Sequence, residues 1–468
     1  MKATTSPAKL LIVILIVSFL SVPSVRTFSD VVLVYNSTTV SEEPLSIILM
    51  IGDGMGFEHV ELARLVEVGE FGSLNMQDSD WNASVTTHSA NAAVTDSAAA
   101  GTAIATGTKT NNYIVGMDAS LNPLETILEF AQTLNKSTGV VSTSTIAHAT
   151  PASFMTHVND RNDETEIVRQ IVEEAGVDVL LGGGSGLFTG AQIASMASNG
   201  YSVVYNRTEL ATVISGKVLG LFAASHLNFE YDRDFAIQPS IAEMTNKSIE
   251  LLSQDPDGFF LMVEGSQIDF AAHNGDKVRN ALETIAFDKA VDVAMDYVKD
   301  NNNTILIVTA DHKTGGLVVL SHNLSSELPE GLLSEQDKRT LRAERANNVT
   351  VDWTTIYHTN AQVPLFALGN AFSDMSEDLT IDNTDIYDLM KDFYLGNPLN
   401  ETELTTTTTT TTGSTTTTTS ETETTTDTTS TTEPTNGPNI PLDSYLVLAV
   451  SIASAIVILG VLVLIKRR

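Results

Sequence analysis

The sequence has no cysteine among its 468 residues, few aromatic side chains and few basic ones. Without cysteine, a disulfide-stabilised scaffold is excluded. Lysine and arginine number 25 against 58 aspartates and glutamates, a formal net charge of −33. A chain this acidic lacks the basic surface that binding to a phosphate backbone requires, so we expect no nucleic-acid partner. Because 42% of the residues are hydrophobic, the chain is not disordered throughout, and it contains a large core.

The N-terminal segment has the pattern of an export signal. Lys2 and Lys9 precede an unbroken apolar run over residues 10–22, which is too short to span a bilayer but typical of a signal-peptide core. The small residues near Ser24 fit the preference of a signal-peptide cleavage site for small side chains. We therefore expect a signal peptide over 1–25 and a linker over 26–43, with a retained anchor as the alternative interpretation.

The C-terminal segment predicts a stalk and a membrane anchor. Residues 400–443 are dominated by threonine, which favours an extended stalk, either O-glycosylated or a bare linker. Residues 444–465 carry no charge, and a helix rising about 1.5 Å per residue would cross the roughly 30 Å hydrocarbon layer. The basic residues 466–468 then predict a cytoplasmic tail. We expect a single-pass cell-surface protein whose large domain lies outside the cell.

Sequons for N-glycosylation are consistent with an exported glycoprotein, although so short a motif also occurs by chance. The nine asparagines are Asn36, Asn82, Asn135, Asn206, Asn246, Asn302, Asn323, Asn348 and Asn400.

Residues 44–399 remain as one large domain, in which short apolar runs alternate with helical patterns. The runs cover 45–51, 140–141, 177–181, 259–263, 304–309 and 364–368. They are apolar at nearly every position, as strands covered on both faces are. Helices are expected after Asn122 and Pro123, and over about 285–298. The sequence therefore predicts an α/β fold with a mostly parallel central sheet flanked by helices on both faces.

Polar side chains follow several of these strands. Asp53 comes after the first run, Glu264 and Asp269 after 259–263, and Asp311 and His312 after 304–309. The strand near Val140 leads to His148 and Thr150. Ligands in such folds bind beyond the carboxyl ends of the strands, and clustered buried carboxylates need compensating cations. Imidazole with carboxylate suits zinc, whereas carboxylate with hydroxyl suits magnesium.

Two local patterns add to this expectation. Asp269 and His273 are four residues apart, which places both on one face of a helix. Asp96 is a candidate helix cap with Ser97 as the first helical residue, so the Ser97 hydroxyl would lie at the positive end of the helix dipole. A bound cation could activate Ser97 as a nucleophile. Taken alone, Ser97 would equally fit an alanine-rich packing helix. His59, His88, His157, His226 and His322 lie in no motif and are interpreted as ordinary polar residues.

Together these motifs resemble the alkaline phosphatase family. The similarity is carried by Gly-Asp-Gly-Met-Gly around Asp53, Thr-Asp-Ser-Ala-Ala around Ser97, the segment from Glu264 to His273, Thr-Ala-Asp-His-Lys-Thr-Gly-Gly from Thr309, and His358-Thr359 before Val363-Pro364. It covers nearly all of residues 45–395, in the family's order.

The resemblance implies a phosphomonoesterase that forms a phosphoserine intermediate on Ser97, with two zinc ions and one magnesium ion. One zinc would be held by Asp269, His273 and His358. The second would be held by Asp53, Asp311 and His312. Magnesium would take Asp53, Thr150 and Glu264. Arg161, 13 residues after His148, matches the family's phosphate-binding arginine. On composition alone, Arg161 would instead form a surface ion pair with Asp160, Asp163 or Glu164. The family also suggests a homodimer.

Two positions depart from the best-known bacterial form. His148 stands in place of an aspartate in the magnesium shell, which makes the metal preference of the third site an open question. Phe270 replaces a lysine or histidine that would reach phosphate through water. Alternatives within the sequence are a phosphodiesterase or another hydrolase of the superfamily, or a surface module that has lost catalysis. The absence of a Cys-Pro-Arg motif weighs against a sulfatase, and the complete ligand set weighs against a non-catalytic module.

Overall fold

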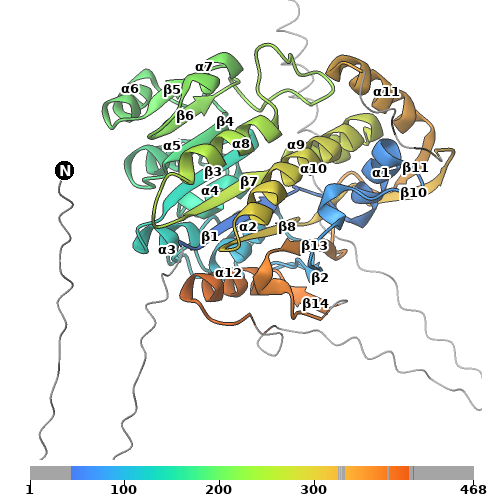
Figure 1. Cartoon of the computed structure of the whole chain (residues 1–468). Helices are drawn as coiled ribbons and strands as arrows, with labels where there is room; N and C mark the ends of the chain where they lie inside the picture. The colour runs from blue at the N-terminus through green and yellow to red at the C-terminus, as the bar shows by residue number, and fades with distance from the viewer. Residues whose placement is uncertain are drawn as a thin grey trace, which may run out of the picture. The chain divides into compact units, whose positions relative to one another are not determined.

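The computed structural model describes residues 44–399, except 325, 327, 329–332 and 377–378, together with Leu404. One ten-stranded sheet runs through this part of the chain (Figure 1). In sheet order its strands are β14 (Leu379–Asp382), β2 (Trp81–Thr86), β13 (Val363–Leu368), β8 (Thr304–Thr309), β1 (Ser46–Ile51), β7 (Phe259–Glu264), β3 (Ser137–Thr145), β4 (Val179–Gly183), β6 (Val218–Leu221) and β5 (Ser202–Val204).

Adjacent strands of this sheet are parallel except at β13, which pairs antiparallel with both β2 and β8. Every residue of β1, β7 and β8 is buried. This burial explains why their sequences are continuously apolar rather than alternating, because each strand is covered on both faces. The mostly parallel α/β fold predicted from the sequence is confirmed.

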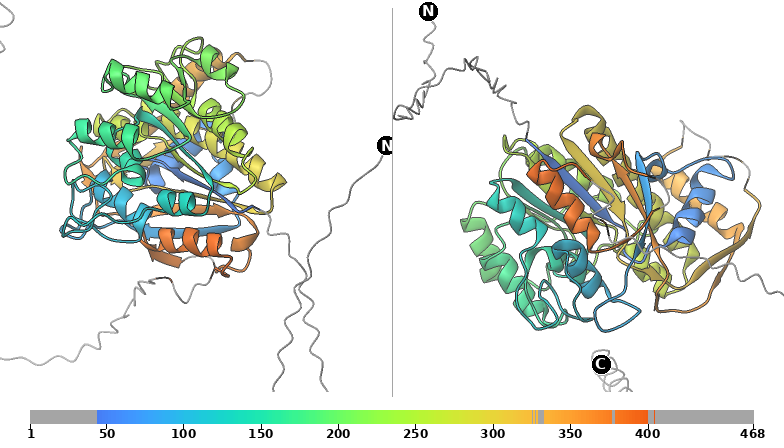
Figure 2. Two further views of the ribbon diagram at one scale, coloured as in Figure 1. Left: turned by 90° about the vertical axis from the view of Figure 1, so that its left-hand side faces the viewer. Right: turned by 90° about the horizontal axis from the view of Figure 1, so that it is seen from below.

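Two groups of helices cover opposite faces of the sheet (Figure 2). The first group contains α1 (Phe57–Val68), α8 (Ile241–Leu252), α9 (Gln267–His273), α10 (Lys277–Asp300) and α11 (Glu335–Asn347). The second contains α2 (Ser97–Thr106), α3 (Ile127–Thr133), α4 (Ala149–Met155) and α12 (Asp385–Leu395). The remaining helices are α5 (Glu164–Glu173), α6 (Gly190–Ser198) and α7 (Arg207–Thr212). Two small antiparallel pairs join β9 (Lys313–Thr314) to β12 (His358–Thr359) and β10 (Leu317–His322) to β11 (Val349–Trp353).

One predicted helix start was wrong. Helix α3 begins at Ile127, not after Asn122 and Pro123, and Pro123 instead forms an isolated bridge with Met117. The start is fixed by a capping box: the Thr126 hydroxyl accepts a hydrogen bond from the Glu129 amide (3.1 Å), and the Glu129 carboxylate accepts one from the Thr126 amide (2.8 Å). Helix α10 also begins earlier than predicted, because Asp276 caps its first turn.

The predicted signal peptide (1–25), linker (26–43), transmembrane segment (444–465) and tail (466–468) lie outside the described residues, as does the stalk (400–443) apart from Leu404. Within the described part of the chain, no helix has both the length and the apolar character needed to cross a membrane.

Candidate metal centre

The carboxyl ends of the central strands bring the predicted polar residues together. Asp53 follows β1, Glu264 ends β7, and Asp311 and His312 follow β8. Gly54 has a backbone φ of +71°, which glycine adopts without strain, and its amide donates to Asp311 Oδ1 (3.0 Å). The glycine after Asp53 therefore lets the loop turn back and orient a carboxylate that lies 257 residues further along the chain.

Several buried polar atoms at this edge have no hydrogen-bond partner among the described residues. They are both carboxylate oxygens of Asp53, Thr150 Oγ1, His148 Nδ1, Glu264 Oε1 and Asp269 Oδ1. Burial raises the pKa of Asp53, with the charges of Asp311 and Asp269 adding to the effect. Burial, together with Asp269 and Glu264, also raises the pKa of Asp311 to about 7. Such a concentration of unpaired buried acceptors is costly unless a cation lies among them, so the residues present fit bound metal.

A first cluster surrounds Asp269, which offers one ligand atom within 4.8 Å of those of His312 and His358, and His273 faces the same carboxylate. His273 and His358 share an orientation. His273 Nδ1 lies 2.6 Å from the Ile356 carbonyl and His358 Nδ1 lies 2.9 Å from the Thr95 carbonyl. Because a carbonyl only accepts, each Nδ1 carries a proton, and each ring turns its Nε2 toward the Asp269 carboxylate. These two Nε2 atoms lie 3.2 Å apart, and His273 Nε2 is also 3.2 Å from Asp269 Oδ2. Second hydrogen bonds of this kind fix the tautomer of metal-binding histidines.

A second cluster contains Asp53, Asp311 and His312, which each offer one atom within 4.8 Å of the others. His312 Nε2 lies 3.1 Å from Asp311 Oδ2, 3.6 Å from Asp53 Oδ1 and 3.1 Å from Ser97 Oγ. Burial lowers the pKa of His312, so the ring is neutral. The three ligand candidates and the candidate nucleophile thus lie around one point.

A third cluster contains Asp53, His148 and Glu264, and Asp53 is therefore shared with the second. Burial lowers the pKa of His148 to about 3, with Arg161 and His226 adding to the effect. Glu264 Oε2 accepts a hydrogen bond from Ser142 Oγ (2.6 Å), which leaves Oε1 as the free oxygen. This cluster combines carboxylates and a neutral imidazole.

Two aromatic rings contact the His148 ring. Phe270 and His226 both meet the His148 ring edge-on, at centroid distances of 5.6 Å and 5.8 Å, and they contact each other at 4.7 Å. The sequence alone led us to interpret His226 as an ordinary polar residue, and it did not indicate that His226 lies beside the third cluster. No local motif could have revealed it, since His226 follows β6 and reaches His148 only through the tertiary fold.

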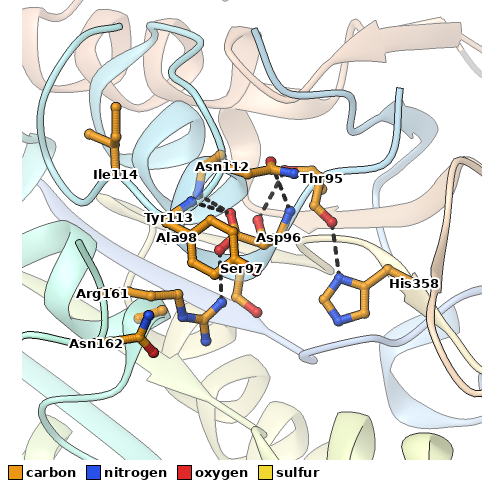
Figure 3. Close-up of polar contacts among 12 residues, drawn as sticks. Thr95, Asp96, Ser97, Ala98, Asn112, Tyr113, Ile114, Arg161, Asn162 and His358 are labelled. Atoms are coloured by element: carbon orange, nitrogen blue, oxygen red, sulfur yellow. Dashed lines mark hydrogen bonds and ion pairs between the residues drawn. The ribbon is translucent and has the colours of Figure 1, made fainter. Parts of the chain in front are cut away.

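Ser97 begins α2, and Asp96 caps that helix by accepting a hydrogen bond from the Ala99 amide (Figure 3). The other Asp96 oxygen accepts from Arg161 at 3.0 Å. The composition-based alternative for Arg161, an ion pair with Asp160, Asp163 or Glu164, is therefore wrong. Arg161 also lies 3.3 Å from His148 Nε2. Its guanidinium is held between the helix that carries Ser97 and the third cluster.

A mostly parallel α/β sheet with buried carboxylate and imidazole clusters beside a capped serine defines a metal-dependent hydrolase. The chain belongs to the alkaline phosphatase family, because the family model for alkaline phosphatase matches residues 45–341. It is therefore a phosphatase, with phosphate esters as its substrates and a dependence on metal. His358 lies beyond the matched residues, and the structure brings it to the site through the pairing of β12 with β9.

Relatives and solved structures agree with this assignment. The chain is 36% identical to alkaline phosphatase 4 of Bacillus subtilis over 314 residues, which cover 64% of this chain and 68% of that protein. The crystal structure of a cold-active alkaline phosphatase from a psychrophilic Shewanella has a TM-score of 0.66 and 31% identity, covering 75% of this chain and all of that one. A histidine-to-aspartate variant of the Antarctic TAB5 enzyme, solved with magnesium in its M3 site, has a TM-score of 0.62 and 26% identity, covering 75% of this chain and 98% of that one.

Proposed function

We propose that this chain hydrolyses phosphomonoesters through a phosphoserine intermediate on Ser97, using two zinc ions and one magnesium ion. Asp269, His273 and His358 would hold the first zinc, and Asp53, Asp311 and His312 the second. Asp53, Thr150 and Glu264, with His148 beside them, would hold magnesium. When bound, these ions act as Lewis acids that favour the ionised serine hydroxyl and neutralise charge on the phosphoryl group.

The observation that carries this proposal is the position of Ser97. Its hydroxyl is buried at the capped start of α2, 3.1 Å from His312. In the reaction, Ser97 Oγ forms a bond to phosphorus as the ester P–O bond breaks and the alcohol leaves. Water then cleaves the Oγ–P bond and releases phosphate. Arg161 can bind two phosphate oxygens through its planar guanidinium, and its ion pair with Asp96 keeps it beside Ser97.

The test uses the full-length protein and an aryl phosphate at alkaline pH. We expect hydrolysis that a chelator removes and that zinc with magnesium restores. Ser97→Ala should abolish covalent labelling of the protein by labelled phosphate. Labelling that survives in Ser97→Ala would show that another residue is the nucleophile. A metal-loaded protein without any hydrolysis would contradict the enzymatic proposal, and preference for a diester would favour a sister phosphodiesterase.

We further propose that the catalytic domain (44–399) acts outside the cell as part of a glycosylated, membrane-anchored homodimer, with the signal, stalk and anchor boundaries given above. Six of the seven sequon asparagines in the described residues are exposed, and Asn206 is half-buried as the cap of α7. A mass shift on glycosidase treatment tests glycosylation, labelling of intact cells by a membrane-impermeant reagent tests exposure outside the cell, and the mass of the detergent-solubilised protein tests dimerisation. Failure of any one of them leaves the catalytic proposal standing, since the metal centre does not depend on them.

A further inference from the structure

A cavity of about 280 Å³ lies between α8, α10, α11 and the segment that joins β6 to α8. Its lining contains an unusual number of cations for a chain with a net charge of −33. They are Arg207, Arg233, Lys289, Arg339 and Arg342. None of these residues belongs to the three metal clusters, so the cavity is a separate feature of the molecule. Figure 1 shows α10 and α11, which form two of its walls.

Three of the five cations are neutralised by carboxylates. Arg233 makes two hydrogen bonds with Glu230 (2.7 and 3.0 Å). Arg342 Nε donates to Glu67 (2.6 Å) and Arg207 Nε to Glu243 (2.6 Å). These pairs account for most of the positive charge on the cavity wall. The two remaining cations, Arg339 and Lys289, are not neutralised by a close carboxylate in this way.

Arg339 has no carboxylate partner within ion-pair distance among the described residues. Only 8% of its surface is exposed, its Nε has no hydrogen-bond partner in the described part of the chain, and one terminal nitrogen donates to the Arg233 carbonyl (2.7 Å). The guanidinium lies over the Phe235 ring, 3.8 Å from its centroid. Phe235 therefore fixes the plane of the guanidinium but supplies no negative charge.

Lys289 is also poorly compensated. Its Nζ lies 3.8 Å from Glu335, and the same carboxylate group is closer to Lys338, at 3.0 Å. Burial lowers the pKa of Lys289, with the neighbouring charge of Arg342 acting in the same direction. The cavity thus holds one buried guanidinium without a carboxylate partner among the described residues, and one partly buried ammonium group that shares the Glu335 carboxylate with Lys338.

We propose that this cavity binds a small organic oxyanion, whose phosphate or carboxylate group pairs with Arg339 and Lys289. A buried cation is stable only when it is paired and hydrogen-bonded, and a planar guanidinium with free N–H groups suits an oxyanion. Leu282, Ile285 and Phe235 provide an apolar wall for the carbon part of the ligand, as small-molecule sites combine apolar walls with a few placed polar groups.

The test measures binding of labelled inorganic phosphate to the metal-loaded, full-length protein by equilibrium dialysis. Arg339→Met should bind one phosphate per chain fewer than the unmodified protein, while the rate of ester hydrolysis stays unchanged. This difference does not depend on whether the metal centre also binds phosphate, so its result is separate from that of the proposed function. Equal binding by the two proteins would overturn the proposal.

Lys338→Met is the matched control, because it removes a half-buried cation that does not line the cavity from the same helix, and it should bind as much phosphate as the unmodified protein. If Arg339→Met does not fold, Lys289→Met decides, since it should weaken the same binding event at least tenfold, and unchanged binding there would overturn the proposal. Displacement of the labelled phosphate by malonate at lower concentrations than by unlabelled phosphate would assign the site to carboxylates; the reverse order would assign it to phosphates.

Discussion

The Asp96 carboxylate contacts Arg161 at 3.0 Å with one oxygen and caps the helix that begins at Ser97 with the other. The first oxygen positions a cation, and the second fixes the start of α2. The oxygen that caps α2, Asp96 Oδ1, also accepts a hydrogen bond from the Tyr113 amide (3.2 Å). Tyr113 has a φ of +74°. One side chain therefore connects the candidate nucleophile, the candidate phosphate-binding group and a strained loop.

Asp96→Asn should weaken phosphate binding with little loss of stability. The asparagine oxygen can still cap α2, but the charge that holds Arg161 is gone. A hydrogen bond between charged groups contributes about 1.5–3 kcal/mol and one to a neutral amide about 0.5–1.5 kcal/mol, so a loss of about 1 kcal/mol should weaken inhibition by phosphate roughly fivefold. Inhibition constants measured at several phosphate concentrations check this.

Asp382→Asn is the control for that experiment. Asp382 pairs with Lys109 at 2.9 Å, and the side chains of the two pairs are equally buried. Asp382 lies outside the three metal clusters, so its replacement should leave phosphate inhibition unchanged. Equal weakening in both variants would mean that the Asp96 effect is structural rather than local.

Removal of metal should destabilise the folded protein. The carboxylates of Asp53, Glu264 and Asp269 would then remain buried without a counter-charge. A ligand present at 1,000 times its Kd stabilises the folded state by about 4 kcal/mol, and chelation removes that contribution for each ion. Thermal unfolding with and without chelator measures the loss as a lower Tm. Asp53→Asn should show a smaller chelator-induced shift than the unmodified protein, and an identical shift would contradict the assignment of Asp53.

Stability should depend on pH through Glu283. Burial, with the charge of Glu230 adding to it, raises the pKa of Glu283 to about 8. Between its ordinary value of 4.5 and about 8, the folded state binds more protons at this group than the unfolded state does. The contribution of Glu283 to stability is therefore present at low pH, and it is lost as the pH rises to about 8.

Glu283→Gln cannot ionise, so its free energy of unfolding should fall less between pH 5 and about 8 than that of the unmodified protein. Urea unfolding at a series of pH values measures the difference. Glu344→Gln removes an exposed carboxylate from α11 and should follow the unmodified protein. A Glu283→Gln curve parallel to that of the unmodified protein would show that Glu283 is already ionised in the folded state.

His148→Asp should increase the apparent affinity for magnesium at the third cluster. A carboxylate replaces a neutral imidazole there, and magnesium prefers oxygen ligands. The magnesium concentration for half-maximal hydrolysis should fall about tenfold or more, while the zinc content stays constant. An unchanged magnesium requirement would place His148 outside the metal's coordination shell.

Much of the fold was predictable because the central strands are buried on both faces. The short, continuously apolar runs at β1, β7 and β8 are typical of buried strands. The residues that follow these strands meet at one edge of the sheet, because neighbouring parallel strands end on the same side. The start of α3 was also readable, since Thr126 and Glu129 form a capping-box pattern, but the proline at 123 gave a competing signal.

Other features depended on tertiary contacts that no local pattern encodes. Asp96 and Arg161 are 65 residues apart, and nothing in the sequence around Arg161 distinguishes Asp96 from the nearer acids Asp160 and Asp163. His226 likewise meets His148, although the two residues are 78 positions apart in the sequence. The sequence suggested which residues could lie at the site, whereas the partners that orient them could be identified only from the fold.

The distribution of the metal clusters along the chain has a consequence for how the protein is made. Asp53 lies near the start of the domain and His358 near its end, and the contact of Gly54 with Asp311 joins residues 257 positions apart. Contacts of such long range form slowly, because the chain must close large loops first. No cluster is complete until synthesis has passed residue 264, and the cluster with His358 must wait almost until the domain ends. An ion at the cluster with His358 can therefore enter its final site only after nearly the whole domain has been synthesised, which would make its loading a late step of maturation.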